Sequence, residues 1–266
     1  MYAQARGIKM HYVVDGPQNV EPGAPWVTFV TGIANDTTLW AGQAPALSDK
    51  FRVLRYDLRG QGKSEGTPPP YSIKSLSDDL VALWGALDIK RSHLVGLGLG
   101  STVAMRTAID HPERIIKLVP SCTRAKMVPD FAVMWGKLTE TVKAGGVAAI
   151  VEQTAQRWFT EDFKAAHPDV LDNVRKMVAG TSLDGYLGCV SAFVGLDLED
   201  ELPQIKAPTL FMGGADDKSG GPEVIMRGLA AKVPGASYQP VAKAAHIANV
   251  QNETEYNRIL REFLLA

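Results

Sequence analysis

Short runs of β-branched residues alternate with longer helix-periodic segments in the first half of the chain, and this alternation constrains the fold most strongly. Residues 75–87, for example, carry leucines spaced by three and four, which predicts an amphipathic helix. Strands that alternate with helices of about a dozen residues predict a parallel sheet with crossover helices. The predicted strands are 8–14, 27–31, 51–56, 93–97, 115–120, 208–213 and 237–241, and the other predicted helices are 99–110, 222–233 and 253–265.

The alternation stops in the middle of the chain. Residues 124–198 show helical periodicity without a convincing strand, and the strand and helix pattern returns at residue 208. A helical block inserted into such a core is typical of a cap over one end of the sheet. We therefore predict a core of residues 1–123 and 199–266 with a helical cap of residues 124–198. Pro17, Pro22 and Gly23 predict a turn between the first two strands.

Charge and hydropathy exclude several classes of protein. The 28 Lys and Arg residues are balanced by 29 Asp and Glu residues, so no excess of cations is present to bind nucleic acid. No run of basic residues suggests a membrane-surface patch, and no stretch approaches 18 consecutive apolar residues. The amino terminus lacks the pattern of a signal peptide. We expect a cytoplasmic protein that acts on a small molecule, with no nucleic-acid or membrane partner; the oligomeric state stays open.

The two cysteines indicate neither a disulfide framework nor a metal site. Cys122 and Cys189 are too few for such a framework and lack the spacing of metal ligands. We expect both to be core thiols. The sequence carries no signature of a cofactor or of a metal cluster, so none is predicted.

Three features occur in an informative chain order. Residues 96–100, Gly-Leu-Gly-Leu-Gly, lie between a predicted strand and helix and have the frame of the nucleophile elbow G-x-S-x-G. The third glycine comes too early for a dinucleotide-binding loop, and no lysine follows as in a P-loop. Asp217 follows the strand that ends near Gly213, with Asp216 as the alternative acid. His246 follows the strand that ends at Val241.

The sequence resembles the α/β-hydrolase superfamily, and most closely its 3-oxoadipate enol-lactonase-like branch. The resemblance rests on the triad order above and on residues 56–64, 111–114, 157–160, 207–210 and 245–250. It implies an α/β-hydrolase fold, with a mostly parallel sheet flanked by helices and a helical cap inserted after the sixth strand. The implied activity is hydrolysis of a small lactone or carboxylic ester without a cofactor.

The departure from the family lies at Gly98, where the family has its serine nucleophile. Glycine cannot attack a carbonyl, so the acyl-enzyme route is closed at this position. Ser101 lies one helical turn further on, outside the glycine frame, and Cys122 lies just past a strand end. We expect neither to be a nucleophile.

The resemblance implies that other parts of the machinery are kept. The backbone N–H groups of Ile33 and Leu99 would form the oxyanion hole, which survives a change of side chain. Asp217 would orient His246 so that its second ring nitrogen faces the pocket. The alternative for His246 is a buried structural histidine.

Two explanations of Gly98 are open on the sequence alone. The glycine is either an engineered replacement in a lactone or ester hydrolase, or natural. A natural Gly98 would leave room for a water with His246 as general base, giving slow direct hydrolysis. It would also suit a non-hydrolytic homologue, namely a lyase, a cofactor-free oxygenase or a ligand-binding protein.

Four side chains of the predicted cap are expected to contact substrate: Arg124, Trp135, Trp158 and Tyr186. Arg124, Lys126 and Arg157 could meet a carboxylate, although solvated surface is the default expectation for each. The remaining histidines have no partners at a useful spacing and are expected to be structural or exposed: His11, His93, His111 and His167.

Overall fold

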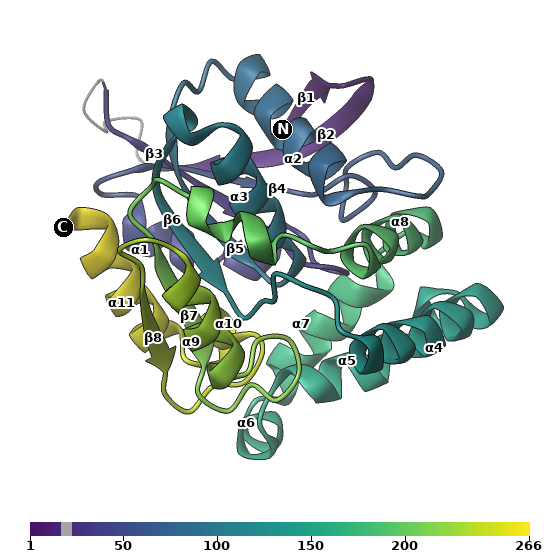
Figure 1. Ribbon diagram of the computed structural model, residues 1–266. Helices are drawn as coiled ribbons and strands as arrows, with labels where there is room; N and C mark the ends of the chain where they lie inside the picture. The colour runs from purple at the N-terminus through teal and green to yellow at the C-terminus, as the bar shows by residue number, and fades with distance from the viewer. Residues whose placement is uncertain (17–22) are drawn as a thin grey trace.

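The computed structural model describes residues 1–16 and 23–266, which form an eight-stranded sheet flanked by helices (Figure 1). The strand order is β1-β2-β4-β3-β5-β6-β7-β8; β1 and β2 run antiparallel to their neighbours, and the pairs from β4 to β8 are parallel. The predicted mostly parallel sheet is confirmed. The strands are β1 Tyr2–Ala5, β2 Ile8–Asp15, β3 Trp26–Val30, β4 Arg52–Tyr56, β5 Ser92–Leu97, β6 Ile115–Ser121, β7 Leu210–Gly214 and β8 Ser237–Val241.

Helices cover both faces of this sheet. One layer contains α2, α3 and α9, and the other contains α1 and α11, which pack against each other (Figure 1). A central strand covered on both faces is buried along its whole length, and all six residues of β5 are buried, four of them apolar or glycine. The core helices are α1 Gln43–Leu47, α2 Ile73–Ala86, α3 Leu99–Asp110, α9 Glu223–Lys232, α10 Ala248–Gln251 and α11 Glu253–Leu265, with 3₁₀ turns at Thr37–Trp40, Pro112–Arg114 and Glu199–Gln204.

The amphipathic pattern of α2 explains its place in the fold. Leu76, Leu80 and Leu83 are fully buried, and Ser72 and Ser75 form a reciprocal capping box at the start of the helix.

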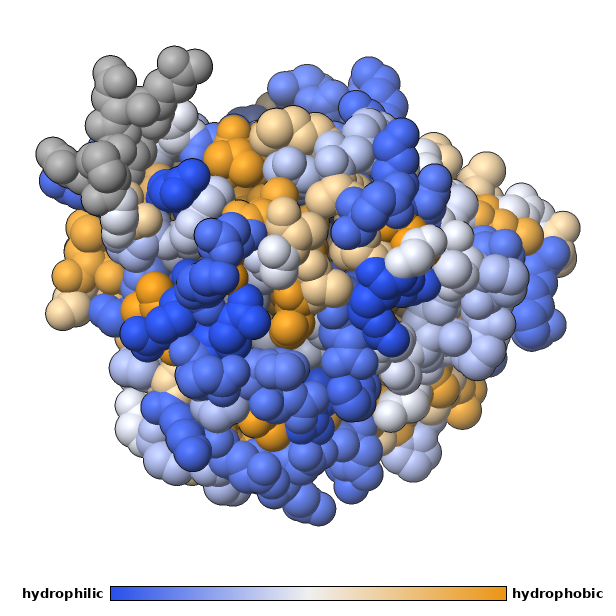
Figure 2. Space-filling view, turned by 90° about the horizontal axis from the view of Figure 1, so that it is seen from above, coloured by the Kyte–Doolittle hydropathy of each residue, from blue (hydrophilic) through white to orange (hydrophobic). Residues whose placement is uncertain are grey.

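On the face shown in Figure 2, hydrophobic residues form small groups between hydrophilic ones.

Five α-helices lie between β6 and β7 and gather at one end of the sheet (Figure 1). The two ends of this insertion are joined where Lys126 pairs with Asp197 in an antiparallel bridge. The expected boundaries of the cap, 124 and 198, enclose these helices. They are α4 Pro129–Gly145, α5 Val151–Trp158, α6 Glu161–Ala166, α7 Pro168–Ala179 and α8 Leu183–Val194, with a 3₁₀ turn at Val147–Ile150.

By length and hydropathy, no single helix of the described residues could cross a membrane. Helices α7 and α8 satisfy the length and composition requirement only when taken together, and they meet at an angle of 93°.

The structure adds one strand that the sequence pattern did not predict. Strand β1 contains no β-branched residue, and it is a strand because it pairs with β2, with Tyr2 opposite His11. The turn expected at Pro17 and Pro22 lies outside the described residues.

Helix α3 approaches β3 closely at Gly100. A Cβ atom added at Gly100 would lie 2.3 Å from the Val30 carbonyl oxygen and 2.5 Å from that of Thr31. Both neighbours are backbone atoms of the central sheet, which cannot move aside cheaply. Glycine at this position therefore sets how closely α3 packs on the sheet.

We predict that Gly100→Ala lowers the free energy of unfolding by at least about 2 kcal/mol, since it overpacks a rigid backbone contact. Urea unfolding measures the change. The matched control is Gly228→Ala in α9, where an added Cβ meets nothing within 4 Å. That substitution should raise stability by up to about 1 kcal/mol through helix propensity. Equal effects of the two substitutions would contradict the assigned role of Gly100.

His93 on β5 gives the fold a pH dependence. The residue is only 4% exposed, its ring packs edge-on against Phe51, and its Nδ1 has no hydrogen-bond partner among the described residues. Burial, with the positive charges of Lys117 and Arg91, lowers the pKa of His93 to about 4. Protonation of this ring therefore opposes folding.

We predict that stability falls as the pH is lowered from about 6.5, the pKa of an unfolded histidine, to about 4. In that window the unfolded chain binds a proton that the folded chain does not. This difference lowers the free energy of unfolding by about 2 to 3 kcal/mol. His93→Gln should remove this loss, as measured by urea unfolding at pH 7 and pH 4.5. The control is the same substitution at the exposed His167. An unchanged pH profile in His93→Gln would show that His93 is not the source.

Candidate active site

Gly98 forms the turn between β5 and α3 in a conformation that favours glycine. Its φ is 55° and its ψ is −119°. The end of β6 holds this turn on both sides. The Gly98 N–H donates to the Ser121 carbonyl at 3.0 Å, and the Thr123 hydroxyl donates to the Gly98 carbonyl at 2.9 Å. The backbone at Gly98 is therefore fixed by its neighbours.

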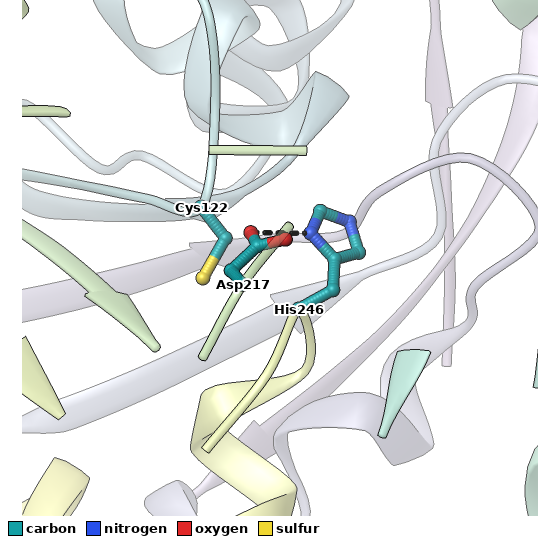
Figure 3. Close-up of side chains that lie close together, drawn as sticks. All are labelled: Cys122, Asp217 and His246. Carbon is teal, nitrogen blue, oxygen red and sulfur yellow. Dashed lines mark hydrogen bonds and ion pairs between the residues drawn. The ribbon is translucent and has the colours of Figure 1, made fainter. Parts of the chain in front are cut away.

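Asp217 and His246 form a hydrogen-bonded pair at the ends of neighbouring strands. Asp217 Oδ2 lies 3.0 Å from His246 Nδ1 (Figure 3). The same oxygen also accepts the Gly221 N–H at 2.9 Å. Asp217 Oδ1 accepts the N–H groups of Ser219 and Gly220. Asp216, the alternative acid, is exposed and is not the partner of His246.

The surroundings of Asp217 keep it ionised. Burial by itself raises the pKa of this carboxyl. The charge and hydrogen bond of His246 and the N–H groups of Gly221 and Ser219 act in the opposite direction. These interactions outweigh burial, so the pKa of Asp217 lies well below its usual range. An ionised Asp217 favours the tautomer in which His246 Nδ1 carries the proton and Nε2 is free to accept one.

The free nitrogen of His246 faces Gly98. A Cβ atom added at Gly98 would lie 3.7 Å from His246 Nε2, and apart from the adjacent residues of the chain this imidazole is the only described group within 4 Å. The Trp158 ring from the cap flanks the imidazole, with 6.4 Å between the ring centroids. The imidazole therefore stands over an open space at the elbow.

Ile33 and Leu99, the two residues expected to form the oxyanion hole, line the same pocket as Gly98 and His246. Leu99 is the first residue of α3, so its N–H has no acceptor within the helix, and Ile33 lies in the loop after β3. Among the described residues, neither N–H has a hydrogen-bond partner. Gln61 fixes the Ile33 loop, because its Oε1 accepts the Ala34 N–H at 2.8 Å while its Nε2 lies 3.3 Å from the Cys189 sulfur of α8.

These groups line an inner pocket of about 60 Å³ between the sheet and the cap. Such a volume holds on the order of five water molecules, so it suits a small substrate. Three of the cap residues expected to contact substrate line it: Trp135, Trp158 and Tyr186. Arg124 instead lines a wider outer groove, which adjoins the inner pocket at Arg157.

One expectation for a polar side chain is wrong, and another is incomplete. Arg157 is not solvated surface, because it lines the inner pocket and its Nε is buried. His11 does have a partner, since its Nδ1 lies 2.7 Å from Asp57 Oδ2 in a buried pair. No local pattern indicates that pair, because the two residues are 46 positions apart. Lys126 is exposed and pairs with Asp197.

Ser101 bridges α3 and β6. Its buried hydroxyl donates to the Ser121 carbonyl at 2.9 Å and accepts the Ser121 N–H at 2.8 Å. The hydroxyl thus both donates and accepts within the core, and Ser101 is not among the residues that line the pocket.

Cys122 is unsuited to be a nucleophile. Burial, and then the negative charge of Asp217, raise the pKa of its thiol far above the usual range, so it stays protonated. The ligand atoms of Cys122, Asp217 and His246 lie within 4.8 Å of one another (Figure 3). The Asp217 oxygens already accept hydrogen bonds from His246, Ser219, Gly220 and Gly221, which leaves little room to bind a metal.

Comparison with known proteins agrees with this geometry. The model of the alpha/beta hydrolase fold family matches residues 25–253. The chain belongs to the α/β-hydrolase family. The 3-oxoadipate enol-lactonase 2 of Acinetobacter baylyi is 28% identical over 255 residues, which cover 95% of this chain and 92% of that protein. The RutD protein of Stutzerimonas stutzeri, whose provisional name is carbamate hydrolase, is 30% identical over 96% of both chains.

A crystal structure of the enol-lactonase from Burkholderia xenovorans LB400 superposes with a TM-score of 0.95 at 32% identity, over the full length of both chains. The resemblance to α/β hydrolases and to enol-lactonases, inferred from the sequence, is confirmed.

We predict that Gly98→Ser and Gly98→Ala each lower the free energy of unfolding by about 1 kcal/mol. A residue with a side chain is strained at this positive φ by about 1 to 3 kcal/mol. The substitution also reduces the conformational entropy of the unfolded chain, which stabilises the fold by about 0.4 to 1 kcal/mol. Thermal and urea unfolding measure the effect. Gly136→Ala in α4, where an added Cβ meets nothing within 4 Å, is the control and should not destabilise. Wild-type stability in Gly98→Ala would show that the turn is not strained.

Proposed function

We propose that the protein hydrolyses a small lactone or carboxylic ester, and that Gly98 occupies the position of the serine nucleophile. The observation that carries the proposal is the imidazole of His246, which faces Gly98 across an open space. A serine hydroxyl at this position would extend from the Cβ toward Nε2, within reach of a hydrogen bond. In this chain a water molecule takes the place of that hydroxyl.

Each residue of the site then has a role. His246 Nε2 accepts a proton from the water as its oxygen bonds to the carbonyl carbon, and Asp217 stabilises the imidazolium that forms. The N–H groups of Ile33 and Leu99 donate to the oxygen that becomes negative. When the bond to the leaving oxygen breaks, His246 returns the proton to that oxygen. The products are a carboxylic acid and an alcohol, joined in one molecule if the substrate is a lactone.

The relatives support this choice of reaction, because enol-lactonase and carbamate hydrolase both cleave a bond at an acyl carbon. Turnover by this chain should be slow. Removing the nucleophile of a hydrolytic triad typically costs about six orders of magnitude, and the oxyanion hole and binding retain about 10³ to 10⁴ over water.

We predict that His246→Gln lowers kcat/KM for the best ester or lactone by about 10² to 10⁴, because it removes the general base. Initial rates across a panel of small esters, lactones and carbamates measure the loss. His111→Gln is the control, since His111 does not line the pocket. Gly98→Ser should add a burst of acyl-enzyme that Gly98→Ala lacks.

The same panel separates the alternatives. A burst in the unmodified chain would reveal a nucleophile other than Gly98 and contradict direct attack by water. If neither the unmodified chain nor Gly98→Ser turns over any member, hydrolysis is wrong. A non-hydrolytic role for His246 as base, as in a lyase or a cofactor-free oxygenase, then replaces it.

A further inference from the structure

The second ring nitrogen of His246 has no partner in the described part of the chain. The His246 side chain makes one hydrogen bond there, between Nδ1 and Asp217 Oδ2, which leaves Nε2 unengaged. At the elbow, where a serine hydroxyl would bond to this nitrogen, Gly98 has no side chain. The lone pair of Nε2 is therefore open to any group that enters the pocket, including a carbon–hydrogen bond.

The neighbours of the imidazole restrict its movement. A Cβ atom added at Gly220 would lie 2.0 Å from His246 Cε1 and 2.4 Å from Nδ1, so the backbone of the loop after β7 packs directly against the ring. The Trp158 ring of α5 flanks the imidazole, and Asp217 holds its Nδ1. A base that is fixed in this way keeps its lone pair aligned with a bound substrate.

The inner pocket is lined mostly by apolar groups. Its walls include the rings of Phe131, Trp135, Trp158 and Phe193. Such a lining excludes most water, so a bound carbon acid meets the imidazole directly instead of through solvent. Hydrogen bonds to a developing charge are also stronger in these surroundings than in water.

We propose that the site also catalyses enolisation, the removal of a proton from the carbon between the two carbonyl groups of a small neutral 1,3-dicarbonyl compound. This inference rests on the site of the proposed function, but it needs no acyl bond to be cleaved. The second carbonyl spreads the negative charge that forms on carbon. It thereby brings the acidity of the C–H bond closer to the range in which an imidazole can remove the proton.

The step balances within one substrate molecule. Nε2 takes the hydrogen as a proton, the electron pair of the broken C–H bond forms a C=C double bond, and the carbonyl π pair moves to oxygen. The N–H groups of Ile33 and Leu99 donate to that oxygen, and Asp217 stabilises the imidazolium. Return of the proton to carbon restores the diketone, and its transfer to oxygen releases the enol.

The absence of a side chain at Gly98 favours this step. A serine hydroxyl there would form a hydrogen bond to Nε2 and fill part of the space between the elbow and the imidazole. A carbon acid would reach the base only after breaking that bond. Gly98→Ser should therefore change enolisation and ester hydrolysis in opposite directions.

Exchange of hydrogen for deuterium tests the proposal without any hydrolysis. The probe is 3-methyl-2,4-pentanedione, which has one hydrogen on the carbon between its carbonyl groups and no ester bond. Proton NMR in heavy water follows the loss of that hydrogen in the presence of the full chain. We expect exchange at least about 10²-fold faster than with an equal concentration of free imidazole, since the protein holds the base and the oxyanion donors together.

Substitutions then assign the activity to the site. His246→Gln should reduce exchange to the rate of the buffer alone, whereas His111→Gln, which lies outside the pocket, should leave it unchanged. Gly98→Ser should slow exchange by about tenfold, as expected when a hydrogen bond to Nε2 must first be broken. Gly98→Ala is the matched control, because it adds the Cβ without the hydroxyl and should retain more exchange than Gly98→Ser.

Three outcomes would overturn the proposal. The first is exchange no faster than with free imidazole, and the second is exchange that survives His246→Gln. The third is equal exchange by Gly98→Ser and the unmodified chain, which would show that the open nitrogen is not the base. If His246→Gln does not fold, His246→Asn replaces it.

The result is distinguishable from that of the hydrolysis assay. Exchange by a chain that hydrolyses no ester or lactone supports this inference and contradicts the proposed function. Hydrolysis of an ester or lactone without exchange of the diketone does the reverse.

Discussion

The common direction of the central strands determines where the chemistry of this protein can take place. Because β3, β5, β6, β7 and β8 run parallel, the loops that follow them all open at the same edge of the sheet. Ile33, Gly98, Asp217 and His246 each lie just after one of these strands, although they span more than 200 positions of sequence. The hydrogen bonds of Gly98 to the Ser121 carbonyl and from the Thr123 hydroxyl then fix the elbow backbone between its neighbours.

Much of this arrangement could be predicted from the sequence because its signals are local. Strand and helix periodicity gave the order of elements, and the glycine frame around Gly98 located the elbow. Strand β1 was missed because it depends on pairing with β2 and has no pattern of its own. The pair of His11 and Asp57 was missed for a similar reason, since only folding brings the two residues together.

The cap was harder to interpret than the core. Helical periodicity predicts that residues 124–198 form helices, but it does not determine which side of each helix faces the sheet. Arg124 was therefore included among the expected substrate contacts and Arg157 was not, whereas Arg157 lines the inner pocket and Arg124 lines only the outer groove. The direction of a side chain at a packed helix depends on tertiary contacts that a single sequence does not encode locally.

Gln61 connects the loop after β3 in the core with helix α8 of the cap. Its carboxamide holds the Ala34 N–H with one atom and contacts Cys189 of α8 with the other. Any displacement of α8 must therefore break the contact with Cys189 or pull on the loop that carries Ile33. In the proposed reaction, admission of a substrate beneath the cap and polarisation of its carbonyl are thus linked through one amide group.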